Sequence, residues 1–273
     1  MPARDPHRFI NELDEEALGR LVARLESRAK DAVFARLFEK YVQRLALPPG
    51  VRVFEVGCGT GATLRMLARR SDFAGVACGV DQSPHFIEAA NRFAQAENIG
   101  DRAVFRTGDA HGLDIPAASF DVVIAHTLIS HVTEPAKVLK EMARVVRPGG
   151  MVVVFDGDYS SLTYAYPDHD FGQRMDRALA TATFNNPLIM RDLPRLLPEH
   201  GLTLLDAWGD AVAEIGRGSY FKSFAETYVP YVKRAEMLPD QAVDRWLDDQ
   251  CRAMENGTFF AACNYYTYLA RKA

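Results

Sequence analysis

Residues 51–62 constrain the fold of this chain more than any other stretch, because an apolar run leads there directly into three closely spaced glycines. The stretch reads Val-Arg-Val-Phe-Glu-Val-Gly-Cys-Gly-Thr-Gly-Ala. Its first half has the length and composition of a strand buried on both faces, and residues 63–70 have apolar side chains at helical spacing. Glycines permit a sharp turn and the close approach of a ligand, and a helix N-terminus attracts anionic groups. This order of strand, glycine turn and helix predicts a nucleotide-type pocket.

The glycines do not identify the ligand. Gly57, Gly59 and Ala62 satisfy the loose G-x-G-x-x-G/A pattern of dinucleotide-binding proteins. Glu55, two positions before the first glycine, would place a carboxylate beside the pyrophosphate of a dinucleotide. That acid argues against a dinucleotide, although a nicotinamide oxidoreductase that uses the same glycines stays open as an alternative.

Length and composition limit the class of protein. The 273 residues suit one large α/β domain, and 48% hydrophobic with 25% charged residues is typical of soluble globular proteins. A net charge of −4 without a long basic tract argues against a nucleic-acid partner. The chain has no apolar run of about 18 residues and residues 1–7 form no apolar signal core, so we expect a cytoplasmic protein without a membrane partner. Its four cysteines form no C-x-x-C pair, and we predict no metal site.

The rest of the chain alternates between strand and helix patterns. Helices expected at residues 13–28 and 32–45 precede the glycine stretch, and we expect them to close over the mouth of its pocket. Further patterns predict strands at 74–80, 103–107, 119–125 and 151–155, and helices at 84–94 and 135–146. This rhythm predicts a parallel sheet covered on both faces, with the carboxyl ends of its strands at one edge.

The last third adds two strands and a helical insertion. We expect helices at 167–183, 190–200, 220–235 and 239–254, a strand at 202–215 bulged at Gly209, and a final strand at 258–270. The fold class is therefore α/β, a doubly wound, seven-stranded, mostly parallel Rossmann-like sheet. We predict a single domain over residues 1–273, with a helical cap at 1–47, a core at 48–160, and a C-terminal part at 161–273 whose lid spans about 217–256. The many aromatic residues of this part are expected to form the core of the lid, and a few of them to wall a substrate pocket.

Polar residues follow the predicted strands at the edge where ligands of such sheets bind. Asp81 ends the second strand about 20 residues after the last glycine, where a carboxylate can accept both hydroxyls of a ribose; a helix-capping role is the alternative. Asp109 follows the third strand. His126 and His131 follow the fourth strand, and Asp156 comes directly after residues 151–155.

Taken together, the motifs in residues 35–160 resemble those of class I S-adenosylmethionine (SAM) methyltransferases. The matching motifs are residues 55–61, Asp81, Gly108-Asp109-Ala110, residues 119–123 and Arg147-Pro148-Gly149-Gly150. The resemblance is nearest to small-molecule methyltransferases of bacterial metabolism and natural-product pathways, which are similar to the ubiquinone and menaquinone enzymes in this core. It implies SAM as cofactor and S-adenosylhomocysteine (SAH) as product. The residues that it assigns to cofactor binding are Glu55, Gly57, Cys58, Gly59, Asp81, Gln82, Asp109, Ala110 and His126.

The resemblance also implies methyl transfer to a small molecule, and the aromatic residues of the lid predict that this acceptor has an apolar or aromatic part. A hydroxyl acceptor must lose a proton, so His131 is the candidate general base, and Asp156 could orient its imidazole or hold the acceptor. Two further functions stay open: an N- or C-methyltransferase that works mainly by proximity, and a SAM-binding protein that transfers no methyl group. A homodimer is left open, and the acceptor is not identified.

Four more residues are weaker candidates. Arg28 and Tyr41, on the two N-terminal helices, could reach the carboxylate of the cofactor. The alternatives are that Arg28 forms a salt bridge and that Tyr41 packs in the core. His111 and Asp158 lie near the predicted site and are secondary catalytic candidates.

Overall fold

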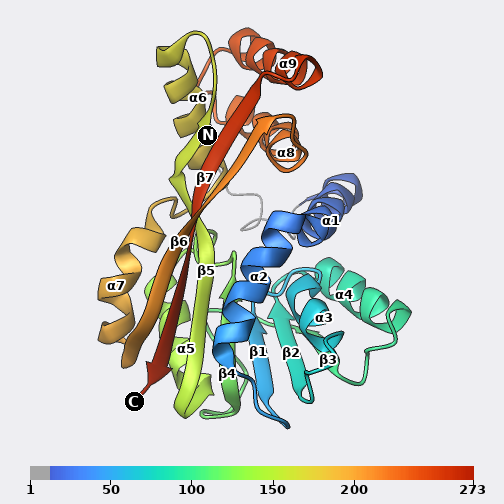
Figure 1. The fold of residues 1–273 in the computed structure, drawn as a ribbon, viewed down its shortest axis with the longest axis vertical. Coiled ribbons are helices and arrows are strands. Elements are labelled where there is room, and N and C mark those ends of the chain that lie inside the picture. The colour runs from blue at the N-terminus through green and yellow to red at the C-terminus, as the bar shows by residue number, and fades with distance from the viewer. Residues whose placement is uncertain (1–12) are drawn as a thin grey trace.

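A single sheet of seven strands runs through the computed structural model, which describes residues 13–273 (Figure 1). The strand order is β3-β2-β1-β4-β5-β7-β6; β1 to β5 are parallel, and β7 is antiparallel to both of its neighbours. The strands are β1 (Arg52–Val56), β2 (Val76–Asp81), β3 (Ala103–Thr107), β4 (Phe120–His126), β5 (Val146–Tyr164), β6 (Leu202–Gly216) and β7 (Phe259–Lys272). The predicted fold class is confirmed.

Helices cover both faces of the parallel part of the sheet. On β1, Val53 and Phe54 are both fully buried but belong to different apolar clusters, because successive side chains of a strand point to opposite faces. One cluster contains side chains of α2, α3 and α4, and the other contains side chains of α5 and α7. These helices are α2 (Ala32–Leu45), α3 (Ala62–Ala68), α4 (Pro84–Ala96), α5 (Pro135–Val145) and α7 (Ile189–Glu199).

A second layer of helices gathers where β5, β6 and β7 extend beyond the other strands (Figure 1). It comprises α6 (His169–Thr183), α8 (Tyr220–Arg234) and α9 (Asp240–Asn256). The predicted helical insertion between the last two strands is present as α8 and α9. Trp246 of α9 and Phe221 of α8 are fully buried, and they belong to the same apolar cluster as the side chains of α2, α3 and α4, so the core of the sheet continues into this part of the chain. The N-terminal helix α1 (Glu15–Lys30) bridges the two parts, because it contacts both α3 and α8.

The fifth strand is much longer than the sequence predicted. The predicted end at residue 155 is wrong, because β7 continues to pair with β5 beyond it. Asp156 lies opposite Tyr266 and Gly157 lies opposite Tyr265, so antiparallel hydrogen bonds extend the strand after its parallel neighbour β4 has ended. The apolar run of residues 151–155 marks only the part of β5 that lies beside β4, although Asp156, Asp158 and Tyr159 are buried as well.

The bulge predicted at Gly209 is also wrong. The irregularity in β6 lies between Leu204 and Asp206, and Gly209 pairs in register with Tyr266. A Cβ atom on Gly209 would lie 2.8 Å from the Tyr266 ring, so the glycine makes room for an aromatic side chain.

Two further observations concern the described residues only. No helix within residues 13–273 is long and apolar enough to cross a membrane. Nor does this part of the chain hold a group of three His, Cys, Asp or Glu side chains that could ligate a metal ion. Residues 1–7, where the sequence shows no signal core, lie outside the described residues.

Asp176 on α6 should make stability depend on pH. Burial raises the pKa of its carboxyl group from 3.8 to about 7, although hydrogen bonds from the Tyr164 N–H and from Thr163 act to lower it. Because the folded state binds this proton more tightly than the unfolded state, the free energy of unfolding should fall as pH rises from about 4 to about 7, by up to about 1.4 kcal/mol per pH unit. In urea unfolding, Asp176→Asn should remove this decline, whereas Asp170→Asn, at an exposed position of the same helix, should leave it intact. Identical pH profiles for wild type and Asp176→Asn would contradict the assignment.

Candidate active site

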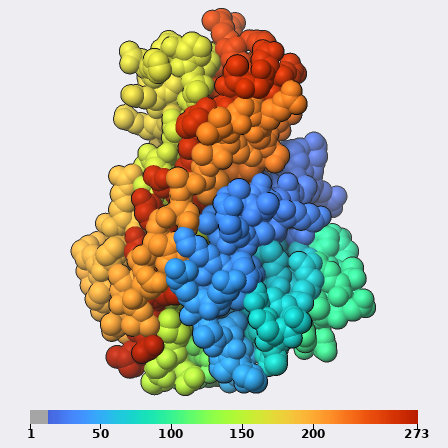
Figure 2. Space-filling view, viewed as in Figure 1, coloured from blue at the N-terminus to red at the C-terminus, as the bar shows by residue number. Residues whose placement is uncertain are grey.

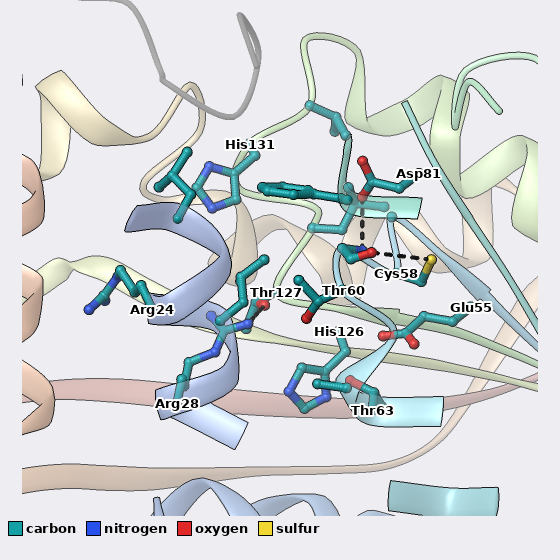
Figure 3. Close-up of a pocket in the computed structure, with 18 of the residues that line it drawn as sticks. Arg24, Arg28, Glu55, Cys58, Thr60, Thr63, Asp81, His126, Thr127 and His131 are labelled. Carbon is teal, nitrogen blue, oxygen red and sulfur yellow. Dashed lines mark hydrogen bonds between the residues drawn. The ribbon is translucent and has the colours of Figure 1, made fainter. Parts of the chain in front are cut away.

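A cavity of about 380 Å³ lies at the carboxyl ends of the parallel strands, which is a volume typical of small-ligand sites (Figure 3). Its wall is formed by the glycine turn and the ends of β1, β2 and β4, and α1 lies across it. The structure brings together the nine residues that the sequence assigned to the cofactor, together with His131. All ten line the cavity: Glu55, Gly57, Cys58, Gly59, Asp81, Gln82, Asp109, Ala110, His126 and His131.

The glycine turn has a backbone that other residues adopt only with strain. Gly57 and Gly61 have φ angles of 68° and 72°. A Cβ atom on Gly61 would lie 2.5 Å from the buried ring of Phe105. The N–H of Cys58 donates to the carbonyl of Val80 at 2.8 Å, which ties the turn to β2. The turn is therefore rigid, and its backbone is open to a ligand.

Asp81 is held by backbone groups on two elements. Its Oδ2 accepts from the Gly59 N–H and its Oδ1 from the Ser83 N–H, both at 2.9 Å. Burial raises the pKa of the carboxyl group, and these hydrogen bonds act to lower it. The N-cap of α4 is Ser83, whose Oγ accepts from the Phe86 N–H, so the helix-capping alternative for Asp81 is wrong.

Glu55 carries the most unusual side chain of the cavity. It is 1% exposed, and its Oε2 is buried without a hydrogen-bond partner. Burial raises the pKa of this carboxyl group well above its ordinary value, against the lowering effects of a hydrogen bond with Thr63 and of the Arg28 charge. A buried carboxyl oxygen without a partner costs free energy, and a cationic ligand group in the cavity would offset that cost.

Helix α1 is fastened across the glycine turn by polar contacts that the sequence does not reveal. Glu26 accepts from the Thr60 hydroxyl and from Arg65 Nη2, both at 2.6 Å. Arg28 lines the cavity and donates to Thr127 Oγ1 at 2.7 Å (Figure 3). Tyr41, the other weaker candidate on the N-terminal helices, does not line the cavity, because its hydroxyl lies 2.9 Å from His126 Nδ1 in the core.

The end of β4 combines a neutral histidine with a strained threonine. Burial lowers the pKa of His126 well below its ordinary value, and the Arg28 charge lowers it further, so the ring is uncharged at neutral pH. Thr127 has a φ of 55°, which is uncommon for a β-branched residue and is typical of functional sites. The N–H of Thr127 donates to the carbonyl of Phe155 at 2.6 Å. Thr127 lines the cavity, as expected for a residue directly after the fourth strand, but its bond to Arg28 has no signal in the sequence.

His131 lies on a loop that is held from two sides. Its ring centroid is 4.9 Å from that of Phe184. Asn185, on the connection between α6 and α7, donates from its side chain to the His131 carbonyl, and Asn186 donates to the Val132 carbonyl at 2.6 Å. These two asparagines are functional candidates that the sequence analysis missed, because they lie about 54 residues away in the chain.

Asp156 does not lie where the sequence placed it. It is fully buried within β5 and does not line the cavity. Its Oδ2 accepts from the Ser130 N–H at 3.0 Å, and its Oδ1 accepts from the Gly157 N–H at 2.8 Å. Burial raises its pKa, and the nearby His131 acts to lower it. Asp156 therefore holds the loop that carries His131 through the Ser130 N–H, and is not positioned to hold a ligand itself.

The secondary catalytic candidates have structural partners. Asp109 Oδ1 accepts from the N–H and from Nδ1 of His111, at 2.9 and 2.8 Å. Partial burial acts to raise the pKa of Asp109, but the hydrogen bonds from His111 lower it overall. Asp158 is buried in an ion pair with Arg191 at 2.8 Å.

Aromatic rings close the end of the cavity away from the glycine turn. Five aromatic residues from β5, α8 and the end of α6 line it: Tyr159, Phe184, Tyr220, Phe224 and Tyr228. Tyr159 and Phe184 are stacked face to face. The cavity thus has a polar end at the strand edge and an aromatic end beneath α6 and α8. Figure 2 shows α1 and α8 in contact at the surface over this region.

Comparison with known proteins agrees with this geometry. Residues 54–154 match the methyltransferase domain family. A protein from a Streptomyces fradiae transposon, of uncharacterised function, is 31% identical over 82% of this chain and 63% of its own length. The 27-O-demethylrifamycin SV methyltransferase of Amycolatopsis mediterranei is 34% identical over 48% of this chain and 47% of its own length. The 2-methyl-6-phytyl-1,4-hydroquinone methyltransferase of Synechocystis is 34% identical over 54% of this chain and 40% of its own length. The chain thus spans 40 to 63% of the length of these relatives.

Solved structures share the fold. The [4+2]-cyclase SpnF has a TM-score of 0.59 at 23% identity, covering 88% of this chain and 80% of that one. Geranyl diphosphate C-methyltransferase from Streptomyces coelicolor has a TM-score of 0.56 at 16% identity, and the match covers 88% of this chain and 78% of that one. The sheet and its edge cavity define a methyltransferase-type α/β domain. Residues 54–154 thus form a methyltransferase domain of the class I SAM-dependent kind, as the motifs predicted, and the curated relatives that share it include enzymes named as methyltransferases of small molecules. Because a cyclase shares the fold, the fold alone does not specify the reaction.

The glycine turn yields a stability prediction. Gly61→Ala should suffer from both a positive φ and a collision with Phe105, whereas Gly149→Ala has a similar φ of 74° and no atom within 4 Å of the added Cβ. We expect Gly149→Ala to lower the free energy of unfolding by about 1–2 kcal/mol, and Gly61→Ala by about 1–3 kcal/mol more. Urea unfolding of the two variants measures the difference. Equal losses would mean that the ring of Phe105 yields without cost.

Proposed function

We propose that this chain binds SAM in the cavity and transfers its methyl group to a hydroxyl oxygen of a small molecule. The observation that carries the proposal is Glu55, whose buried Oε2 has no partner and which lines a cavity of the right size. An ammonium group of the cofactor would pair with this carboxylate, whereas the pyrophosphate of a dinucleotide would be repelled by it. This argues for SAM over a nicotinamide cofactor.

The other predicted cofactor residues suit the same ligand. Asp81 has its two oxygens fixed by backbone donors and retains lone pairs for the hydroxyls of a ribose. Arg28 lies within electrostatic range of Glu55 and could pair with the carboxylate of the cofactor. Asp109 and Ala110 line the cavity beyond Asp81, where the resemblance assigns the adenine.

The residues around His131 suit a general base. When bound, SAM supplies a methyl group on a positively charged sulfur, which an acceptor attacks in line. His131 accepts the proton of the acceptor hydroxyl. The buried charge of Asp156 stabilises the imidazolium that forms, and Asn185 and Phe184 hold the loop and the ring in position. Aromatic walls exclude water and orient an apolar acceptor.

The cofactor assignment can be tested with ligands that differ in one part. SAH should raise the melting temperature of the protein, and NAD should not. Glu55→Gln should weaken SAH binding by about tenfold or more, because a hydrogen bond to a charged group contributes about 1.5–3 kcal/mol. Binding of 5′-methylthioadenosine, which lacks the amino-acid part, should be equal in both proteins. Calorimetric titration measures all three ligands.

Glu39→Gln is the matched control, since Glu39 of α2 pairs with Arg70 outside the cavity and its loss should leave SAH binding unchanged. Stabilisation by NAD alone would refute the proposal. An equal loss of SAH and methylthioadenosine binding in Glu55→Gln would show that Glu55 supports the turn and does not pair with an ammonium group.

The role of His131 requires an acceptor, which a mass-spectrometric screen for the gain of one methyl group would identify. With that acceptor, His131→Ala should lower turnover by about 10²–10⁴-fold while the affinity for SAH stays the same. Equal turnover in both proteins would remove His131 from the mechanism and favour an amine or carbon acceptor.

A further inference from the structure

Arg24 is a buried cation at the aromatic end of the cavity. It lies on α1, one turn before Arg28, is 8% exposed and lines the cavity. Its guanidinium carbon lies 5.1–5.2 Å from the ring centroids of Tyr220, Phe224 and Tyr228, which are on α8. Rings at this distance attract a cation but carry no net charge.

No negative charge in the described part of the chain balances Arg24. Its hydrogen-bond partners are hydroxyl groups, of Ser223 at 3.2 Å and of Tyr228, and no carboxylate of residues 13–273 forms an ion pair with it. Ionised tyrosines do not supply the charge either, because burial raises the pKa of Tyr220 and Tyr265. A guanidinium has five N–H donors, so Arg24 retains donors for a ligand.

The two arginines of α1 serve different ends of the cavity. The charge of Arg28 acts on Glu55 and His126, beside the glycine turn. The charge of Arg28 also acts on Tyr159 and Tyr220. The charge of Arg24 acts on Tyr164 and Tyr220, but on neither Glu55 nor His126. In Figure 3 the Arg28 side chain reaches toward Thr127, whereas that of Arg24 points away from Glu55 and Asp81. The cofactor end therefore has a cation of its own, and Arg24 belongs to the other end.

We infer that the methyl acceptor is an anion, with a carboxylate or phosphate group that binds Arg24 and an apolar or aromatic body that lies between the rings of the cavity. An oxyanion is the ligand that a planar guanidinium binds best, through two parallel hydrogen bonds. Arg24 thereby sets the substrate class of the proposed methyltransferase, and this inference rests on that proposed function.

The test uses benzoate and phenyl phosphate as minimal probes, with benzamide as the neutral match for benzoate, on the full chain saturated with SAH. Benzoate, phenyl phosphate or both should raise the melting temperature of the wild type, and benzamide should not. Arg24→Gln should weaken binding of the anionic probe by about tenfold or more. Arg24→Lys should weaken it by less, because lysine keeps the positive charge but lacks the paired, coplanar N–H donors of a guanidinium. Whichever of the two probes binds more tightly shows whether the anionic group of the acceptor is a carboxylate or a phosphate.

Two controls separate this inference from a purely structural role and from a cofactor role. Arg20→Gln removes a charge from the same helix at a position that is 60% exposed, and it should change nothing. The shift caused by SAH should be the same in all variants. If Arg24→Gln fails to fold, Arg24→Lys decides: the anion must still stabilise it, and benzamide must not.

Three results would overturn the inference. They are no anion shift in the wild type, an equal anion shift in Arg24→Gln, and loss of the SAH shift in a folded Arg24→Gln protein. The first two would make Arg24 a structural link between α1 and α8, and the third would assign it to the cofactor. By contrast, a wild type that SAH does not stabilise would refute the proposed function, and the same probes without SAH would still report on Arg24.

Discussion

The unpaired carboxyl oxygen of Glu55 is the constraint around which the polar end of the cavity is arranged. It lies near the end of a strand whose two faces are both buried, so water does not offset the cost of its charge. Arg28 moderates that cost from α1, and Thr63 does so from the start of α3. Glycines directly after the strand bring a ligand to the main chain beside this carboxylate. A cationic ligand group would complete the arrangement, which is the physical basis for assigning SAM.

Helix α1 connects the two ends of the cavity. Glu26 fastens it to the glycine turn and to α3, while Arg24 packs among the rings of α8. Arginines on successive turns of one helix face thus divide the site into a cofactor end and an acceptor end.

Much of the fold and of the cofactor site was predictable from the sequence, because both depend on local patterns. Each parallel strand has an apolar run of its own, and the helix beginning at Pro84 has its N-cap serine beside it in the chain. The rule that parallel strands end at one edge then predicts that Glu55, Asp81 and Asp109 meet. The polar contacts of the acceptor end could not be predicted in this way, because Arg24 and Asn185 gain their roles from partners about 199 and 54 residues away.

Spacing within single βα units was enough to predict the methyltransferase-type domain, the fold class and the residues around the glycine turn. The position of Asp156 depends on tertiary pairing that no local pattern reveals. The antiparallel partner β7 extends β5 beyond its apolar run, and Asp156 is thereby buried outside the cavity. The position of Arg24 in the acceptor end likewise depends on the tertiary structure. An arginine on an amphipathic helix is normally solvated, and it becomes a buried, unbalanced cation here because α8, inserted between the last two strands, folds back onto α1.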